Sequence, residues 1–218
     1  LSEMKKFVLP NDYPDMPSSL MHIYLIEAGP RLLAGMSEES SAHAEQFLRE
    51  MGVNILLNKR VVDYRDHKVV LEDGTEIATR TFIWVSGVTG VTIGNLDASL
   101  IGRGGRIKVD SFNRVEGMNN VFAIGDQCIQ LADENYPNGH PQLAQVAIQQ
   151  GELLAKNLVR MEKGREMKPF HYRNLGSMAT VGRNRAVAEF SKVKMQGWFA
   201  WVMWLVVHLR SILGVRNK

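Results

Sequence analysis

The first third of the chain alternates short apolar runs with one amphipathic segment. His22–Glu27 is an apolar run that ends in an acid, which predicts a strand. Ser37 is a suitable N-cap for a helix that reaches about Met51 and stops before Gly52. Val53–Leu57 is again apolar. The order predicts a strand–helix–strand unit with parallel strands.

The next segment is patterned as short strands separated by turns. Asp73-Gly74 lies between Val69–Leu71 and Glu76–Ile77, and this dipeptide between apolar runs is typical of a hairpin. Thr81–Val85 predicts a further buried strand, which ends on the small residues Ser86-Gly87.

The second half has a different pattern, with one long helix and few strands. Pro141 suits the first turn of a helix that reaches about Met161. The other elements expected in this half are strands at Arg106–Val109 and Val121–Ile124, a hairpin of Ser177–Val181 with Ala186–Phe190, and an aromatic and aliphatic helix at Gly197–Gly214.

At the other end of the chain, residues 1–19 are polar, contain three prolines and predict a loop or linker.

Composition narrows the class of protein. The 218 residues are 45% hydrophobic and 22% charged, as in a packed globular protein. A net charge of +3 is too small to favour nucleic acid as a partner. The single cysteine, Cys128, allows no disulfide within the chain and fits a reducing compartment. Because the chain opens on Leu1, we expect it to be a fragment of a longer protein.

The hexapeptide Val-Phe-Ala-Ile-Gly-Asp is the most informative motif. It delivers the carboxylate of Asp126, next to Gly125, to the point where a predicted strand becomes a loop. Ligands of open α/β sheets lie just outside the carboxyl ends of such strands. A turn residue that only caps the next segment is the alternative interpretation.

Two other strand ends carry candidate chemistry. Glu27 stands where an acid can accept hydrogen bonds from the ribose hydroxyls of NAD, although no glycine fingerprint precedes it in this chain. Ser86 and Gly87, followed by Val88, are small enough for a backbone to approach a cofactor closely. An exposed acid and a tight turn are the respective alternatives.

The helix after Pro141 presents amides. Gln145 and Gln149 are four residues apart and share one face, while Ala144 begins a separate stripe of small residues. Amides donate and accept without charge, which suits a neutral carbonyl ligand. A solvated glutamine face remains the alternative.

In this order, the motifs resemble the C-terminal half of bacterial type II NADH dehydrogenases, the single-subunit NADH:quinone oxidoreductases, together with the segment Gly-Ser-Met-Ala-Thr at 176–180. The resemblance implies an α/β fold with parts of two Rossmann-like dinucleotide-binding domains. Residues 1–86 would complete the NADH-binding domain and residues 87–165 the FAD-binding domain. Residues 166–218 would form a hairpin and an amphipathic membrane-associating helix.

The resemblance also implies roles for single residues and requires neither a covalent catalyst nor a metal. Two departures from the family pattern are Ser86, in place of the more common Ala, and Gln127, which separates the Asp from Cys128. The implied FAD contacts centre on Gly125 and Asp126, the NADH ribose contact is Glu27, the loop along the cofactors is Ser86, Gly87 and Val88, the helix contacts are Ala144 and Gln145, and the quinone site is lined by Gln145 and Gln149.

The tail is rich in tryptophan from Trp198 to Trp204 and is too short for a membrane span. Basic residues follow it, among them Arg210, Arg216 and Lys218. Aromatic residues with basic neighbours are typical of a helix that lies in a membrane surface. The alternative is a core or dimer-interface helix.

The implied function is electron transfer from NADH through FAD to a membrane quinone, without proton pumping, by a peripheral enzyme on the cytoplasmic face of the bacterial inner membrane. Two other functions stay open: a soluble FAD-dependent disulfide reductase and a non-catalytic membrane-surface module. A homodimer is neither favoured nor excluded. We expect the fragment by itself to be inactive and to bind FAD weakly or not at all.

Overall fold

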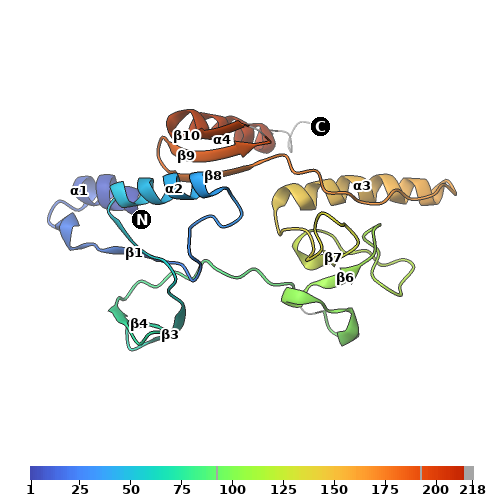
Figure 1. The fold of residues 1–218 in the computed structure, drawn as a ribbon, viewed down its shortest axis with the longest axis horizontal. Coiled ribbons are helices and arrows are strands. Elements are labelled where there is room, and N and C mark those ends of the chain that lie inside the picture. The colour runs from blue at the N-terminus through green and yellow to red at the C-terminus, as the bar shows by residue number, and fades with distance from the viewer. Residues whose placement is uncertain (92, 192, 214–218) are drawn as a thin grey trace. The chain divides into compact units, whose positions relative to one another are not determined.

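The computed structural model describes residues 1–91, 93–191 and 193–213, and the side chains up to Arg210 (Figure 1). The basic residues Arg216 and Lys218 lie outside the described residues. The chain forms two compact units, residues 1–83 with the C-terminal segment from Leu175, and residues 84–174. Each unit is described separately below.

The predicted strand–helix–strand unit is confirmed in the first compact unit. β1 (Ile23–Ile26) pairs in parallel with β2 (Val53–Leu56), and α2 (Glu38–Glu50) connects them. The Ser37 hydroxyl caps α2 by accepting the Ser40 N–H. Gly52, with φ of +76°, provides the left-handed residue that ends the helix.

A three-stranded antiparallel sheet follows. It consists of β3 (Val61–Arg65), β4 (Lys68–Leu71) and β5 (Glu76–Ala78), and the predicted turn at Asp73-Gly74 joins the last two. Gly74 has φ of +84°, a conformation that glycine adopts without strain.

The N-terminal segment differs from the predicted loop. A π-helix covers Met4–Val8, α1 covers Leu9–Asp12, and a 3₁₀ turn covers Ser18–Leu20. Pro10 is the second residue of α1, and the helical backbone enters α1 from the π-helix without a break, because Val8 and Leu9 both have helical dihedral angles. The loop prediction for residues 1–19 is therefore wrong over Met4–Asp12.

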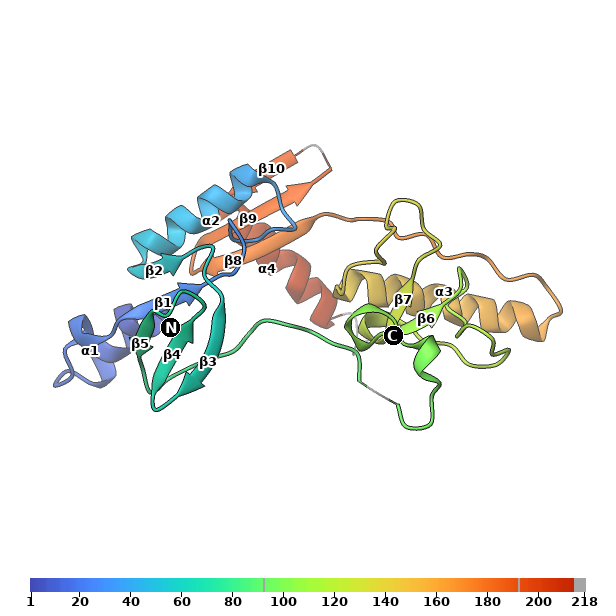
Figure 2. The same ribbon diagram turned by 60° about the horizontal axis from the view of Figure 1, so that its bottom comes forward.

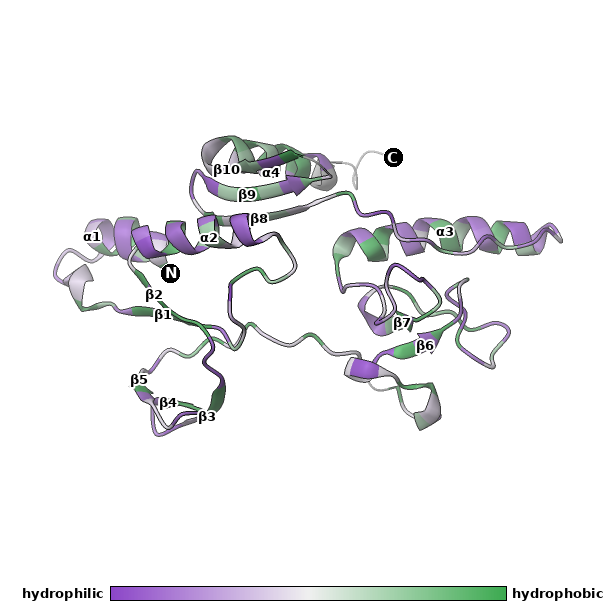
Figure 3. Ribbon diagram, in the orientation of Figure 1, coloured by the Kyte–Doolittle hydropathy of each residue, from purple (hydrophilic) through white to green (hydrophobic). Residues whose placement is uncertain are grey.

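The C-terminal part of this unit is a second antiparallel sheet with α4. The predicted hairpin is confirmed as β8 (Ser177–Gly182) and β9 (Arg185–Phe190), and β10 (Val193–Gln196), which was not predicted, pairs with β9. α4 (Gly197–Leu213) confirms the predicted tail helix and is mostly apolar (Figure 3).

Strand β9 is covered on both faces, by α2 on one side and α4 on the other (Figures 1 and 2). Arg185 and Glu189 bond to residues at the two ends of α2. Ala186 and Ala188, which alternate with them, pack against Ala200 of α4 and are completely buried. The alternation is that of a strand between two layers.

The second unit holds a short parallel pair and one long helix. β6 (Ile107–Val109) pairs with β7 (Cys128–Gln130), and 3₁₀ turns cover Ala98–Leu100, Arg103–Gly105 and Gly125–Gln127. α3 (Ala144–Glu162) confirms the predicted long helix, although Pro141 precedes it and Leu143 is its N-cap residue. The core includes Ile107, Val109 and Val115.

Two strand predictions are wrong. Val121–Ile124 makes only an isolated bridge at Phe122, and the strand begins after Asp126, at Cys128. Thr81–Val85 is not a strand, and Val85 is 86% exposed. Apolar content predicted both strands. Residues 121–123 do pair with residues 113–115 through two backbone hydrogen bonds, but this pairing stops after a single bridge and does not extend into a strand.

Candidate functional site

The Gly125–Gln127 turn is the centre of the candidate site, and it lies in the second unit. Asp126 is exposed, and within the described part of the chain no side chain or N–H group bonds its carboxylate. Gly125 has φ of +65°. Because the preceding segment is not a strand, Asp126 stands before β7 and not at a strand's carboxyl end as predicted. A free carboxylate beside this glycine can accept hydrogen bonds from ligand hydroxyls.

The start of α3 holds this turn from one side. The Gly125 N–H donates to Gln150 Oε1 at 2.7 Å, and Gln142 Nε2 donates to the Asp126 carbonyl at 3.1 Å. A Cβ atom on Gly125 would lie 3.2 Å from the Cβ of Ala147. Glycine therefore allows both the left-handed turn and its close contact with the helix.

The loop that contains Ser86, Gly87 and Val88 is tied to the same turn. The Gln127 amide accepts the Val91 N–H at 2.8 Å and donates to the Val91 carbonyl at 2.7 Å. All three loop residues are exposed, and Gly87 has φ of +85°. The second unit thus brings together the loop, the Asp126 turn and the start of α3.

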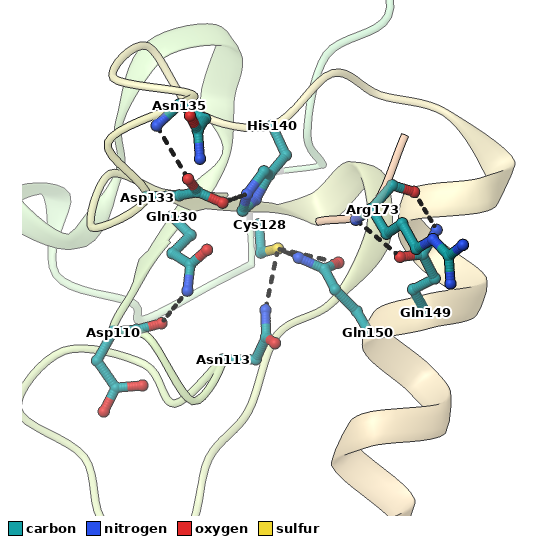
Figure 4. Close-up of polar contacts among 10 residues, drawn as sticks. All are labelled: Asp110, Asn113, Cys128, Gln130, Asp133, Asn135, His140, Gln149, Gln150 and Arg173. Atoms are coloured by element: carbon teal, nitrogen blue, oxygen red, sulfur yellow. Dashed lines mark hydrogen bonds and ion pairs between the residues drawn. The ribbon is translucent and has the colours of Figure 1, made fainter. Parts of the chain in front are cut away.

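The glutamines of α3 have different surroundings. Gln149 bonds both backbone groups of Arg173, donating to the carbonyl at 2.9 Å and accepting the N–H at 3.0 Å (Figure 4). Gln145 is partly exposed, and Ala144, the first residue of α3, is exposed. Among the residues that the structure describes, no side chain caps this helix N-terminus, so its partial positive charge is not neutralised by a cap.

Gln150 was not among the predicted site residues, yet it is 1% exposed and connects the turn to Cys128. Its Nε2 lies 3.6 Å from Cys128 Sγ, which also receives the Asn113 amide at 3.9 Å (Figure 4). Burial raises the pKa of the Cys128 thiol, so the sulfur is a packed, protonated group. The signal for Gln150 is its helical spacing from the buried Val146 and Asn157.

A second polar pair was missed by the sequence patterns. His140 Nε2 lies 3.0 Å from Asp133 Oδ2, and both side chains are 4% exposed (Figure 4). The hydrogen bond from His140 holds the pKa of Asp133 below its usual range. Phe170 and Tyr172 surround the His140 ring. The hydrogen bond and the ring contacts of His140 therefore hold the segment that precedes α3 against the aromatic cluster of Phe170 and Tyr172.

Glu27 is in the first unit, at the end of β1 as predicted. Its Oε1 accepts the Gly29 N–H at 2.7 Å, and its own backbone N–H donates to Leu56. The side chain is partly exposed, which leaves the other carboxylate oxygen available to a ligand.

Helix α4 carries an exposed apolar face. The six side chains of this face are exposed by 37% to 69%. The opposite side contributes Ala200 and Trp201 to the packed core. The six exposed side chains are Trp198, Phe199, Met203, Val206, Val207 and Leu209.

Within residues 1–91, 93–191 and 193–213, the structure has no helix with both the length and the hydropathy of a membrane span.

Comparison with known families gives two matches. Residues 14–151 match the family model of pyridine nucleotide-disulphide oxidoreductases, and residues 174–218 match the NDH2 C-terminal domain. The chain is 34% identical to the type II NADH:quinone oxidoreductase NdhA of Mycobacterium tuberculosis, covering 99% of this chain and 47% of the relative. It is 32% identical to the internal alternative NAD(P)H-ubiquinone oxidoreductase A1, mitochondrial, of Arabidopsis thaliana, covering 91% and 42%.

Solved structures share the fold. NDH2 from Plasmodium falciparum, in complex with NADH, superimposes with a TM-score of 0.84 at 18% identity, covering 96% of this chain and 58% of that one. The sulfide:quinone oxidoreductase of Aquifex aeolicus gives a TM-score of 0.73 at 15% identity, covering 98% and 54%. The chain spans about half the length of the curated relatives it matches.

Proposed function

Because the chain belongs to the pyridine nucleotide-disulphide oxidoreductase family, we propose that it is part of a flavoenzyme that passes electrons from NADH through FAD to a quinone. The observation that carries the proposal is the free Asp126 carboxylate, held between the Ser86–Val91 loop and the start of α3. Relatives named NADH:quinone oxidoreductases, and the matching NDH2 C-terminal domain, support a quinone over a disulfide as the acceptor.

The residues around the turn fit a flavin dinucleotide. The Asp126 carboxylate would accept hydrogen bonds from the ribityl hydroxyls, and Gly125 would let the backbone approach the cofactor. Gly87 and its neighbours Ser86 and Val88 would lie along it. The flavin, when bound, would supply hydride acceptance from NADH and electron delivery to the quinone.

Helix α3 contributes electrostatics and positioning. Its uncapped N-terminus, at Ala144, favours negative charge on a neighbouring ring. Gln145 would offer an amide to a quinone carbonyl, and Gln149 would border the same site while its amide fixes the backbone at Arg173. These roles position the partners, so no side chain of the chain is required as a covalent catalyst.

Glu27 would bind the second dinucleotide. At the end of β1 it can accept hydrogen bonds from the ribose hydroxyls of NADH, and its negative charge would repel a 2′-phosphate. The Gly29 N–H holds one carboxylate oxygen in place, which pre-orients the other.

The exposed face of α4 supports attachment to a membrane surface, where a quinone dissolves. Trp198 and Phe199 are 53% and 69% exposed, and an apolar helix face of this kind inserts into the boundary between headgroups and acyl chains. We place the protein as a peripheral enzyme on the cytoplasmic face of the bacterial inner membrane. A homodimer through the same face is the competing use of these side chains.

The test uses the protein that carries this chain, purified and assayed for NADH oxidation with a short-chain quinone and with a disulfide. Quinone-dependent oxidation by a flavin-containing sample is the expected result. Faster turnover with the disulfide would assign the soluble reductase function. A sample without flavin or NADH oxidation that still binds vesicles would assign the non-catalytic membrane module.

A further inference from the structure

A polar pocket of about 420 Å³ lies in the first unit, apart from the residues assigned to the cofactors and the quinone. It is half open to solvent and is bordered by the N-terminal helical segment, the end of α2 at Met51 and the turn between β8 and β9. Its polar lining includes Glu3, Lys6, Arg183 and Asn184. Pockets of this size hold small ligands in other proteins.

The turn that forms one wall is fixed in place. Its backbone is held by Glu3 Oε1, which accepts the Arg183 N–H at 2.9 Å. Asn184 has φ of +62°, the left-handed conformation of a tight two-residue turn. A Cβ atom on Gly182 would lie 2.8 Å from Met51 Cε, so the turn packs closely against the end of α2. The wall is therefore preorganised.

The charges of the pocket are unbalanced. Arg185 is compensated, because its guanidinium lies 3.3 Å from Glu50 Oε2 and over the Phe47 ring. The Lys6 ammonium lies 5.4 Å from the centroid of the Phe7 ring, and within the described part of the chain no carboxylate pairs with Lys6 or with the Arg183 guanidinium. Glu3 is the one opposing acid in the lining, so two uncompensated cations face one carboxylate.

We propose that this pocket binds the phosphate of a phosphate ester. The Arg183 guanidinium can form two parallel hydrogen bonds to phosphate oxygens, and the Lys6 ammonium adds a point charge. The Asn184 amide can donate a further bond. This site is independent of the electron-transfer function proposed above.

Two sources would supply the ligand. The bridge between Ala186 and Gly197 joins the start of β9 to the start of α4, where the exposed Trp198 begins the apolar face. An anionic phospholipid headgroup is therefore one source, and a soluble phosphate ester is the other. Both ligands carry a negatively charged phosphate group that is esterified to an organic group.

The experiment uses the 218-residue chain and two probes. Glycerol 3-phosphate is titrated by calorimetry, and sedimentation is measured with vesicles of phosphatidylcholine with and without phosphatidylglycerol. We expect Arg183→Gln to weaken binding of the phosphate probe about tenfold or more. Arg80→Gln is the matched control, because it removes the same charge from an exposed site in the same unit.

For Glu3→Gln we expect tighter phosphate binding, the opposite of the effect of Arg183→Gln. A gain in affinity cannot be caused by misfolding of the variant. The amide oxygen still accepts the Arg183 N–H, while the repulsive charge is gone, so phosphate binding should tighten about threefold. Binding of glycerol 3-phosphate that Arg183→Gln weakens assigns a soluble ester as an accepted ligand. Vesicle sedimentation that depends on phosphatidylglycerol and falls in Arg183→Gln but not in Arg80→Gln, without binding of glycerol 3-phosphate, assigns the lipid headgroup. Equal losses in Arg183→Gln and Arg80→Gln, or no binding to either probe, would overturn the proposal.

Discussion

Gln127 bonds both backbone groups of Val91, 36 residues away in the sequence, as a neighbouring strand would do. This side chain replaces a backbone partner that the loop would otherwise lack. The loop from Ser86 and the Asp126 turn are therefore connected through the side chain of one residue.

The first prediction concerns this contact. Gln127→Ala removes two hydrogen bonds, so the loop should open locally, and the Val91 N–H should exchange with deuterium about tenfold faster. Exchange followed by mass spectrometry on the fragment containing Val91 measures the effect. Gln46→Ala is the control, because that exposed amide bonds only Glu50 on α2. Unchanged exchange in Gln127→Ala would mean that the loop is held by other contacts.

Asp126→Asn separates binding from folding. The carboxylate is exposed and bonds nothing within the described residues, so the free energy of unfolding should change by less than about 0.5 kcal/mol. Flavin retention should fall sharply, because an amide accepts hydrogen bonds more weakly than a carboxylate. Absorbance near the flavin band and thermal unfolding are measured on one sample of the longer protein that carries this chain, because we expect the fragment alone to hold FAD weakly. Full flavin content in this variant would remove Asp126 from the cofactor site.

Glu189 stabilises the start of α2, where its carboxylate accepts the Ser37 N–H at 3.0 Å and the Ser37 hydroxyl. Glu189→Ala should lower the free energy of unfolding by about 1–2 kcal/mol. Partial burial raises the pKa of Glu189, but the hydrogen bonds from Ser37 and Ser40 outweigh it, and the net pKa is lowered.

Since the folded pKa is the lower one, this stabilisation is present above the unfolded pKa of about 4.3 and is lost as the pH falls. Urea unfolding at neutral pH and at about pH 3 should therefore show a smaller difference between Glu189→Ala and the parent chain in acid. A difference that grows on acidification would contradict the assignment.

Asp133→Asn tests the buried pair with His140. The variant keeps the size of the side chain but loses the charge-assisted hydrogen bond, so it should cost about 1–3 kcal/mol at neutral pH. The pKa of Asp133 is lowered by His140, so the cost should shrink as the pH falls below the unfolded value of about 3.9. Denaturant midpoints across this range give the measurement, and a constant cost at all pH values would argue against a hydrogen bond from His140 to the Asp133 carboxylate.

The exposed apolar face of α4 should contribute to binding of the protein to lipid vesicles. Phe199→Gln alters a side chain that is 69% exposed, so sedimentation with phosphatidylglycerol vesicles should fall several-fold while the thermal midpoint stays within a few degrees. Ala200→Gln places an amide in the fully buried seam with β9 and should instead destabilise the fold. If Phe199→Gln instead dissociates a dimer without affecting sedimentation, the face is a subunit interface.

Much of the first unit was predictable because local signals agree there. The cap at Ser37, the apolar periodicity of α2 and the flanking β1 and β2 all favour the same unit, and the structure contains it. The family resemblance is confirmed by relatives at 30–34% identity, and the α/β dinucleotide-binding fold class by the solved structures. The membrane role of α4, the domain boundaries and the site residues stay predictions.

The errors arise where long-range contacts decide. Val121–Ile124 is more apolar than the real strand Cys128–Gln130, yet the latter pairs with β6 and buries Gln130 to 1% exposure. Gln150 and His140 were missed for a similar reason. Their partners, Gly125 and Asp133, are fixed by the tertiary fold, and polar residues in the core carry no local pattern until those partners are known.

The alternation along β9 has a mechanical consequence. One strand backbone carries both the Glu189 group that holds the start of α2 and the alanines against which α4 rests. Removing α4 would expose one face of β9, and the same strand carries the Glu189 carboxylate that binds the start of α2. Detachment of either helix would therefore destabilise the packing of the other. We therefore expect this part of the molecule to unfold cooperatively, with α4 and α2 sharing one unfolding transition.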